Sequence, residues 1–522
     1  MSESNSDTSY RKPLLIALLV IVASLAVGGW YRTTDLGFRP MHNDEANQFG
    51  KLWDTYAEGK FEYDPHDHHG PTLIFSTIAA RKIQGKSMYN NLSEEQLRMI
   101  PVIYGLLLIL TLLLIVDGLG AAQVAVAAVI LACSPSFIFF SRYYIMELPL
   151  VVFTSLFIGF GWRYYRSGKL PWALAAGVAA GLMHVTKETA AVAWLATGCW
   201  LFLAGVSWWR SRNAEGAFPF RPWHYVLAVA IGLLVSAALY STFFRNPKAI
   251  VDSFATYFNY AERSEGAGHE KPWNYYLRVI AWYKDSVVWS ELPVVLLGVV
   301  GMLVAVLKKQ SLGKYLTVYT LASFAVYSAF AYKTPWTILP AYFGLVLLAG
   351  IGAVYLFRLI PSRAASIALA VLFAGGTLFW FHVQTSRASG EYSADPRNPY
   401  VYNHTSHDVV KLGQTIRALA AKHPEGGNMP IIVYKAPEGG WPLPWYLRGM
   451  PNITYVPKDY DGPISLNAPV IVFGIAEKDR FLLKLSKSHT EQFNFRPGEE
   501  NDVVLLVDKA LWESNQDSAQ AP

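Results

Sequence analysis

An acidic pair, Asp44 and Glu45, is the first group of residues in the chain whose types and spacing could do chemistry. The pair follows the first apolar segment, and the apolar residues behind it recur at helical spacing, namely Ala46, Phe49, Leu52, Trp53 and Tyr56. This spacing predicts an interfacial helix that Asn43 caps. One of the two carboxylates could then act as a general base. The alternative is that both acids only complement the dipole of the helix start.

Three further polar clusters interrupt or border apolar segments. They are Ser141–Pro149 with Arg142, Tyr143 and Glu147, His184–Glu188 with Lys187, and Tyr332–Trp336 with Lys333. Ionisable residues at membrane depth are costly, so these side chains are functional candidates, and their cations could hold an anion. The alternatives are an arginine that snorkels and pairs with the nearby glutamate, a short turn at the interface, and lipid headgroups as the partner of the lysine.

A fourth cluster, Asp64–His69, holds three histidines and two aspartates directly before Gly70 and Pro71. Histidine and carboxylate side chains can ligate a divalent metal ion or hold a phosphate. The metal candidates are His66, Asp67 and His68, although their spacing is not that of a known zinc motif. A plain polar loop before a helix is the alternative, so a metal cofactor stays open.

Composition indicates which elements must position these residues. The chain has 522 residues, of which 53% are hydrophobic and only 16% charged, and its mean hydropathy is +0.24. These values exclude disorder and favour a membrane protein that carries one polar part. The net charge of +6 is too small to argue for a nucleic-acid partner. Both cysteines stand in apolar runs, so a disulfide framework is not expected.

Eleven apolar runs are long enough, or nearly so, to cross a bilayer. They cover 13–30, 98–116, 120–140, 147–162, 171–185, 189–208, 224–243, 292–307, 315–331, 336–357 and 364–382. The first run lacks a convincing cleavage site and is interpreted as an uncleaved span. These runs predict a polytopic helical domain over 1–383 in the plasma or inner membrane.

Lysine and arginine are concentrated in the loops on the side of the N-terminus, which predicts that this side is cytoplasmic. The opposite side then receives the long segments 32–95 and 244–290, the turns near 142–147, 186–188 and 333–335, and the tail. Every unusual polar cluster therefore falls on the extracytoplasmic face. This common side is the strongest functional signal in the sequence.

The tail, 384–522, is polar and alternates helical and strand-like patterns. A helix is expected behind a capping box that Thr405 begins, with an apolar face of Val409, Leu412, Ile416 and Leu419. Strand-like runs cover 431–434, 453–456, 470–473 and 503–507, and a helical run covers 477–487. The pattern predicts a small extracytoplasmic α/β domain.

Acids, cations and aromatic residues on one face suit a lipid-linked phosphosugar. The lipid would lie among the spans, a cation would stabilise the leaving phosphate, and a carboxylate would deprotonate the acceptor. The rival hypotheses are a transporter or flippase, an accessory protein to one, and a scaffold whose tail recruits partners. A transporter would need polar residues in both leaflets and matching broken spans, and neither is apparent.

At these residues the sequence resembles the GT-C glycosyltransferases. These include protein O-mannosyltransferases and aminoarabinose transferases. A nearer resemblance is to a glycosyltransferase family named after an archaeal flippase-activity-associated protein of N-glycosylation. The matching stretches are 42–46, 69–71, 141–144 with Glu147, 186–188, 332–336 and 404–406.

The resemblance implies a polyprenyl-phosphate-linked sugar donor, an inverting transfer, and a lipid, glycan or protein acceptor. It also implies Asp44 as the base, with Glu45 beside it, and Glu147 as a second acid. The remaining implied substrate contacts are His69, Arg142, Tyr143, Lys187, Glu188, Lys333 and Trp336. Some members of the class use a divalent metal ion and others do not, so no cofactor is fixed.

Overall fold

The computed structural model describes residues 3–66, 69–86, 92–210, 221–263, 270–403, 405–436, 440–460, 462, 466–485, 487–495 and 502–519. The chain forms two compact units. The transmembrane unit comprises Met1–Leu36 and Lys51–Ser389, and the α/β unit comprises Gly37–Gly50 and Gly390–Pro522. The predicted boundary at 383 lies close to the observed one at 389. The segment Gly37–Gly50, which was expected to belong with the spans, instead packs with the tail.

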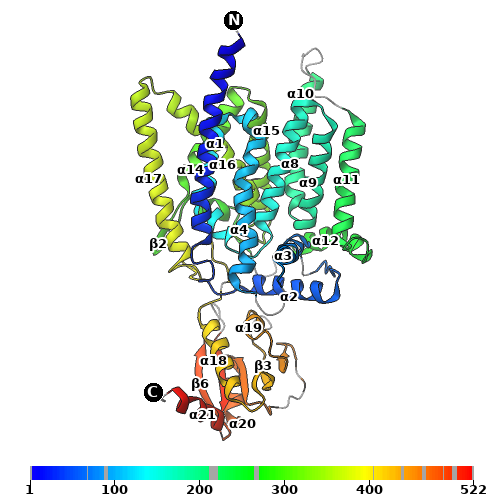
Figure 1. Cartoon of the computed structure of the whole chain (residues 1–522), viewed down its shortest axis with the longest axis vertical. Coiled ribbons are helices and arrows are strands. Elements are labelled where there is room, and N and C mark those ends of the chain that lie inside the picture. Colours follow the sequence, from blue (N-terminus) through cyan, green and yellow to red (C-terminus); the bar gives the residue numbers. More distant parts are fainter. Residues whose placement is uncertain are drawn as a thin grey trace. The chain divides into compact units, whose positions relative to one another are not determined.

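The transmembrane unit is a bundle of long apolar helices that run side by side (Figure 1). Its long helices are α1 (Glu3–Thr33), α4 (Glu94–Thr111), α8 (Glu147–Ser167), α9 (Leu170–Thr186), α10 (Ala190–Arg210), α11 (Pro222–Tyr240), α14 (Leu292–Leu307), α15 (Ser311–Ala329), α16 (Leu339–Arg358) and α17 (Arg363–Ser389). The pair α6 (Ala121–Cys133) and α7 (Pro135–Ser141) bends by 57° at Ser134. Every predicted apolar run therefore contains a helix.

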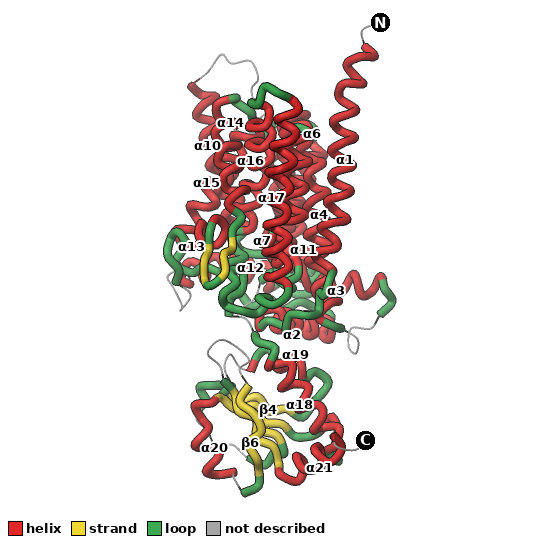
Figure 2. The backbone as a smooth tube through the Cα atoms, turned by 90° about the vertical axis from the view of Figure 1, so that its left-hand side faces the viewer, coloured by secondary structure: helices red, strands yellow, loops and turns green. Residues whose placement is uncertain are grey.

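Among the described residues, six helices are long and apolar enough to span a membrane, or seven if the bent pair counts as one span. Helices α9 and α14 are apolar but shorter. The chain is thus a polytopic membrane protein, and the number eleven stays a prediction. Three short helices lie at the end of the bundle where α1 ends (Figures 1 and 2), namely α3 (Thr72–Ile83), α12 (Lys248–Arg263) and α13 (Tyr275–Ala281).

Glycines bring the helices into close contact. A methyl group on Gly177 of α9 would lie 2.1 Å from the Ala228 carbonyl oxygen of α11, and one on Gly181 would lie 2.4 Å from that of Gly232. Glycines four residues apart let helix backbones approach in lipid, where no hydrophobic effect drives helices together. This packing fixes the C-terminal end of α9, which carries the Thr186-Lys187-Glu188 motif.

The α/β unit is built on a five-stranded sheet, shown in yellow in Figure 2. The strand order is β4 (Ile453–Val456), β3 (Ile431–Tyr434), β5 (Val470–Gly474), β7 (Val503–Asp508) and β6 (His489–Phe495). The first three strands are parallel, and β7 and β6 are antiparallel to their neighbours. The remaining helices are α18 (Asp408–Lys422), α19 (Leu443–Tyr446), α20 (Lys478–Leu485) and α21 (Lys509–Ala519).

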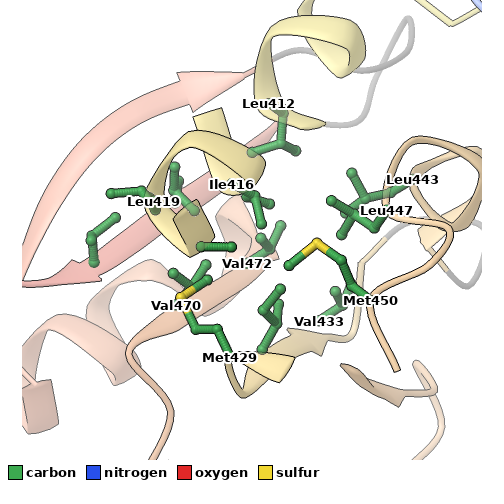
Figure 3. Close-up of a cluster of buried hydrophobic side chains, with 14 of the residues drawn as sticks. Leu412, Ile416, Leu419, Met429, Val433, Leu443, Leu447, Met450, Val470 and Val472 are labelled. Carbon is green, nitrogen blue, oxygen red and sulfur yellow. The ribbon is translucent and has the colours of Figure 1, made fainter. Parts of the chain in front are cut away.

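Alternate residues of each strand face opposite sides of the sheet, which gives the unit two apolar cores. On one side Leu412, Ile416 and Leu419 of α18 lie in one cluster with the strand residues Val433, Val470 and Val472 (Figure 3). On the other side Phe481 of α20 stacks on Phe473, with ring centroids 4.5 Å apart. The predicted helix face and four predicted strands are confirmed by this packing.

Two details of the tail differ from the prediction. The capping box led by Thr405 is wrong, because α18 begins at Asp408 with His407 at its N-cap and no side-chain cap bond. Strand β6 was not predicted. It lies at the edge of the sheet and its sequence, HTEQFNF, contains no continuous apolar run. Edge strands need fewer apolar residues, so the sequence carries a weak signal there.

Candidate active site

The acidic pair lies in the α/β unit, at the start of α2 (Asn43–Glu58). The first helical hydrogen bond runs from the Ala46 amide to the His42 carbonyl oxygen at 2.9 Å, so His42, and not Asn43 as predicted, is the N-cap. The His42 Nδ1 atom accepts from the Asp44 amide at 3.0 Å, and Glu45 Oε2 accepts from the His42 amide at 3.1 Å. This reciprocal pair of bonds is a variant of the capping box, in which a histidine side chain accepts from the second amide of the helix and not from the third.

The two acids have different surroundings. Glu45 is fully buried and pairs with Arg39, its Oε1 atom 3.3 Å from the arginine Nη2. The Asp44 side chain is 52% exposed, and its Oδ2 atom lies 3.9 Å from the Nδ1 atom of His42. A carboxylate that must accept a proton from a substrate needs access to it. The geometry therefore leaves Asp44 as the candidate base and gives Glu45 a structural role.

A buried ion pair joins α8 to the turn that follows α9. Glu147, in the first turn of α8, pairs with Lys187, and each residue is no more than 5% exposed. The carboxylate also lies at the positive end of the α8 dipole. Two predicted site residues, 40 positions apart in the sequence, are thus brought together. Their pairing satisfies both charges within the transmembrane unit.

The predicted motifs at 69–71 and 186–188 also meet. His69 Nδ1 lies 2.9 Å from Glu188 Oε2, and the Tyr63 hydroxyl donates to Glu188 Oε1 at 3.0 Å. Gly70 explains this approach, because a methyl group at its Cα would lie 2.0 Å from the Val185 carbonyl oxygen. Thr72 then donates to the same carbonyl at 3.1 Å. The His-Gly-Pro turn is therefore a docking element for the turn between α9 and α10.

Lys333 lies in the loop between α15 and α16 and is 1% exposed. Its ammonium donates to the backbone carbonyl groups of Lys271 and Phe330. Within the described ranges no carboxylate forms an ion pair with it. Burial lowers the pKa of Lys333. A buried ammonium that contacts only carbonyl groups retains the capacity to bind an anion.

The other three predicted contacts are buried in the same unit. The Arg142 guanidinium donates to four backbone carbonyl groups at the end of α1, among them those of Thr34 at 2.6 Å and Asp35 at 2.9 Å. These bonds engage both terminal nitrogens of the guanidinium and fix Arg142 against the end of α1. Tyr143 and Trp336 pack edge to face with ring centroids 5.6 Å apart, and both are at most 6% exposed.

Sequence reasoning missed Glu291, the N-cap residue of α14. Its carboxylate is fully buried and accepts hydrogen bonds from the Ser134 hydroxyl at 2.5 Å, the Ser136 amide at 3.1 Å and the Tyr342 hydroxyl at 2.8 Å. These bonds hold the bend between α6 and α7. The one available signal was a lone glutamate directly before an apolar run, which is also typical of an ordinary helix start.

A metal site is not formed by the part of the chain that the structure describes, where no group of three or more His, Cys, Asp or Glu side chains could hold an ion. Asp67 and His68 lie outside the described residues, and the side chain of His66 is exposed. His69, which stands beside these candidates, is engaged with Glu188. The geometry of the described residues therefore gives no support to a metal site.

An apolar cavity of about 550 Å³ lies between α8, α9, α10, α11 and α15. Its walls are almost entirely carbon, with aromatic residues such as Trp162, Trp194 and Tyr315 among them. His184 and Ser236 line it near the C-terminal end of α9, and their side chains are joined by a hydrogen bond of 2.5 Å. A long apolar cavity with a polar end fits the chain of a lipid better than a soluble metabolite.

Comparisons with known proteins agree with this architecture. The model of the dolichyl-phosphate-mannose-protein mannosyltransferase family matches residues 26–247, somewhat less than half of the chain. The comparison with curated proteins finds no match. Among solved structures, the chain is similar to ArnT from Cupriavidus metallidurans bound to undecaprenyl phosphate. The TM-score is 0.62 at 15% identity, over 94% of this chain and 97% of that one.

A second similar structure is the archaeal oligosaccharyltransferase AglB from Archaeoglobus fulgidus, in complex with an inhibitory peptide and a dolichol-phosphate. Its TM-score is 0.58 at 13% identity, over 95% of this chain and 77% of that one. These likenesses show that the chain has the fold of the GT-C membrane glycosyltransferases. The class predicted from the sequence is thereby confirmed at the level of the fold.

Proposed function

We propose that this protein is a membrane glycosyltransferase that moves a sugar from a polyprenyl-phosphate donor to an acceptor at the extracytoplasmic face. The observation that carries the proposal is the placement of Asp44. It is the exposed member of an acidic pair whose other member is buried and neutralised. Within a GT-C fold this leaves one carboxylate free to deprotonate an acceptor hydroxyl.

In the proposed reaction Asp44 takes the proton of the acceptor hydroxyl as its oxygen attacks the anomeric carbon of the donor. The bond from that carbon to the phosphate oxygen breaks, and the polyprenyl phosphate leaves with the electron pair. A single attack from the face opposite the leaving group inverts the configuration. The acceptor is a lipid, a glycan or a protein.

The donor phosphate is assigned to the buried cations, above all Lys333, whose ammonium contacts only backbone carbonyl groups. A fixed cation stabilises the charge that develops on the leaving phosphate. The isoprenoid chain is assigned to the apolar cavity between α8, α9, α10, α11 and α15. Support for such a donor comes from the two similar proteins, which were solved with undecaprenyl phosphate and with a dolichol-phosphate.

The test is a transfer assay on the full chain in proteoliposomes with a panel of radiolabelled undecaprenyl-phosphate hexoses, namely glucose, galactose and mannose. Asp44→Asn should lower the rate by about 10²–10⁴-fold, the usual range for a lost general base, with unchanged expression. Lys333→Ala should raise KM for the donor more than Lys333→Arg, which keeps the charge. A wild-type rate in Asp44→Asn contradicts the assigned mechanism, and equal effects of the two Lys333 variants remove the phosphate role.

A further inference from the structure

The N-cap of α2 is an unusual choice of residue. Serine, threonine, aspartate and asparagine are the preferred N-caps because a short side-chain oxygen suffices to accept an amide of the first turn. His42 fills this role with Nδ1, at 3.0 Å from the Asp44 amide. The ring is only 3% exposed, so its burial must be matched by a second interaction.

The two interactions together fix the tautomer of the His42 ring. A backbone amide can only donate, so Nδ1 is an acceptor and carries no proton. The remaining nitrogen, Nε2, therefore bears the ring proton and donates to the Tyr402 carbonyl oxygen at 2.9 Å. His42, which orients the Asp44 backbone, is thus bonded to a residue 360 positions further along the chain.

Other contacts hold the same segment against the C-terminal part of the α/β unit. The Met41 amide donates to the Tyr446 hydroxyl at 2.7 Å. Phe49 packs edge to face on Trp445 with centroids 4.7 Å apart. These contacts explain why the segment Gly37–Gly50 belongs to this unit, although about 340 residues separate it from the rest of the unit.

We infer that His42 is a positioning residue for Asp44, and that the C-terminal α/β unit sets the position of the candidate base through the bond from His42 to Tyr402. The inference rests on the proposed function, since it presumes that Asp44 is the base. A general base acts over hydrogen-bond distances, and a displacement of about 1 Å can cost on the order of 10²-fold in rate.

The chain offers variants that separate the cap from the link. His42→Asn keeps an oxygen that can accept from the Asp44 amide but is too short to reach Tyr402. His42→Ala removes both bonds. His489→Asn is the matched control, because His489 is buried in the same unit and bridges the Ser488 hydroxyl and the Ala468 carbonyl oxygen at 2.8 and 2.9 Å without touching Asp44.

Two measurements are made on the full chain in detergent. The first is kcat and KM with the undecaprenyl-phosphate hexose of the panel that the wild type uses. His42→Asn should lower kcat about tenfold and His42→Ala about a hundredfold, with KM for the donor unchanged and with His489→Asn at the wild-type kcat. The second is hydrogen exchange of the peptide 41–50, which should be faster in His42→Asn than in the wild type and in the control.

Wild-type kcat and wild-type exchange in His42→Asn overturn the inference, because the cap alone would then suffice. Equal losses of kcat in His42→Asn and His489→Asn overturn it as well, since they would reflect general destabilisation. Asp44→Asn is assayed in parallel. A fully active Asp44→Asn refutes the proposed function instead, and hydrogen exchange in His42→Asn still decides whether the link to Tyr402 holds the segment.

Discussion

Two buried glutamates of the transmembrane unit and the proposed base of the α/β unit, Asp44, are carboxylates in opposite surroundings. In the transmembrane unit Glu147 and Glu188 are 2–3% exposed, and each has a lysine or histidine partner. In the α/β unit Asp44 has a side chain that is 52% exposed. An ionised group in an apolar bundle must be paired or hydrogen-bonded to remain there, whereas an exposed one stays accessible to a substrate.

The difference separates residues that have a structural task in the transmembrane unit from the residue proposed to act as the base. Lys187 and Glu188 occupy the turn between α9 and α10, and their partners come from the start of α8 and from the loop before α3. These pairs hold three separate segments together. Ionisable side chains inside the membrane are functional candidates by default, but here the contacts give several of them a structural task.

The largest effect on stability is expected for Lys187→Ala, which leaves Glu147 buried without its cation. Breaking a buried pair typically costs about 3–5 kcal/mol. Thermal unfolding of the purified variant in detergent would measure the loss. The double variant Lys187→Met with Glu147→Leu should recover most of that loss, because apolar residues of similar volume replace buried pairs well. If Lys187→Ala were as stable as the wild type, the buried Glu147 would not need its cationic partner, and the contrast with Asp44 would fail.

The double variant also sharpens the comparison. If its stability returns but transfer from the undecaprenyl-phosphate donor does not, the pair contributes to donor binding as well as to structure. If both return, the pair is structural alone. The two outcomes cannot be told apart by the single variant, since misfolding would abolish transfer in either case.

A slightly smaller effect, about 3 kcal/mol, is expected for Gly70→Ala. The added methyl group would overlap the Val185 carbonyl oxygen and approach the Tyr240 hydroxyl, and backbone atoms cannot move away as a flexible side chain can. The loop would shift and draw His69 away from Glu188. Gly205→Ala in α10 is the control, because a methyl group there meets nothing within 4 Å. Equal melting temperatures for the two variants would refute the docking role of the turn.

In the α/β unit, Glu45→Gln should cost about 2 kcal/mol, because Arg39 loses the buried carboxylate with which it pairs. The glutamine side chain can still accept from the backbone amide of His42. Asp44→Asn should change stability by less than about 0.5 kcal/mol, as exposed substitutions usually do. Thermal unfolding of both variants measures the contrast between the two acids. A larger loss for Asp44→Asn would reverse their assignment.

The sequence predicts the elements well because their signals are local. The eleven apolar runs and strands β3, β4, β5 and β7 need only runs of the right length and residue type. The contrast between Asp44 and Glu45 is not local. The two acids are adjacent and alike, and which one is buried depends on where the helix turns and on Arg39.

Partners far apart in the chain are equally hidden. His69 and Glu188 were both singled out as candidates, but they are 119 positions apart and their contact depends on the backbone approach at Gly70. His42 was noted only as part of a motif, and its bond to Tyr402 spans 360 positions. Glu291 had no signal beyond its place before α14, since its donors come from Ser134 at the bend before α7, from α7 and from α16.

Among the variants of buried contacts, the smallest effect is expected for Tyr63→Phe, which removes the hydroxyl that donates to Glu188 at 3.0 Å. Glu188 keeps its bond to His69, so only one of these two side-chain bonds is lost and the expected cost is about 1 kcal/mol. Combining the variant with His69→Gln should cost more than the sum of the single losses, because the buried carboxylate would then lose its cationic partner as well. Additive losses would instead show that Tyr63 and His69 act on Glu188 independently, and the cluster would not be the cooperative clamp on the α9–α10 turn that the geometry indicates.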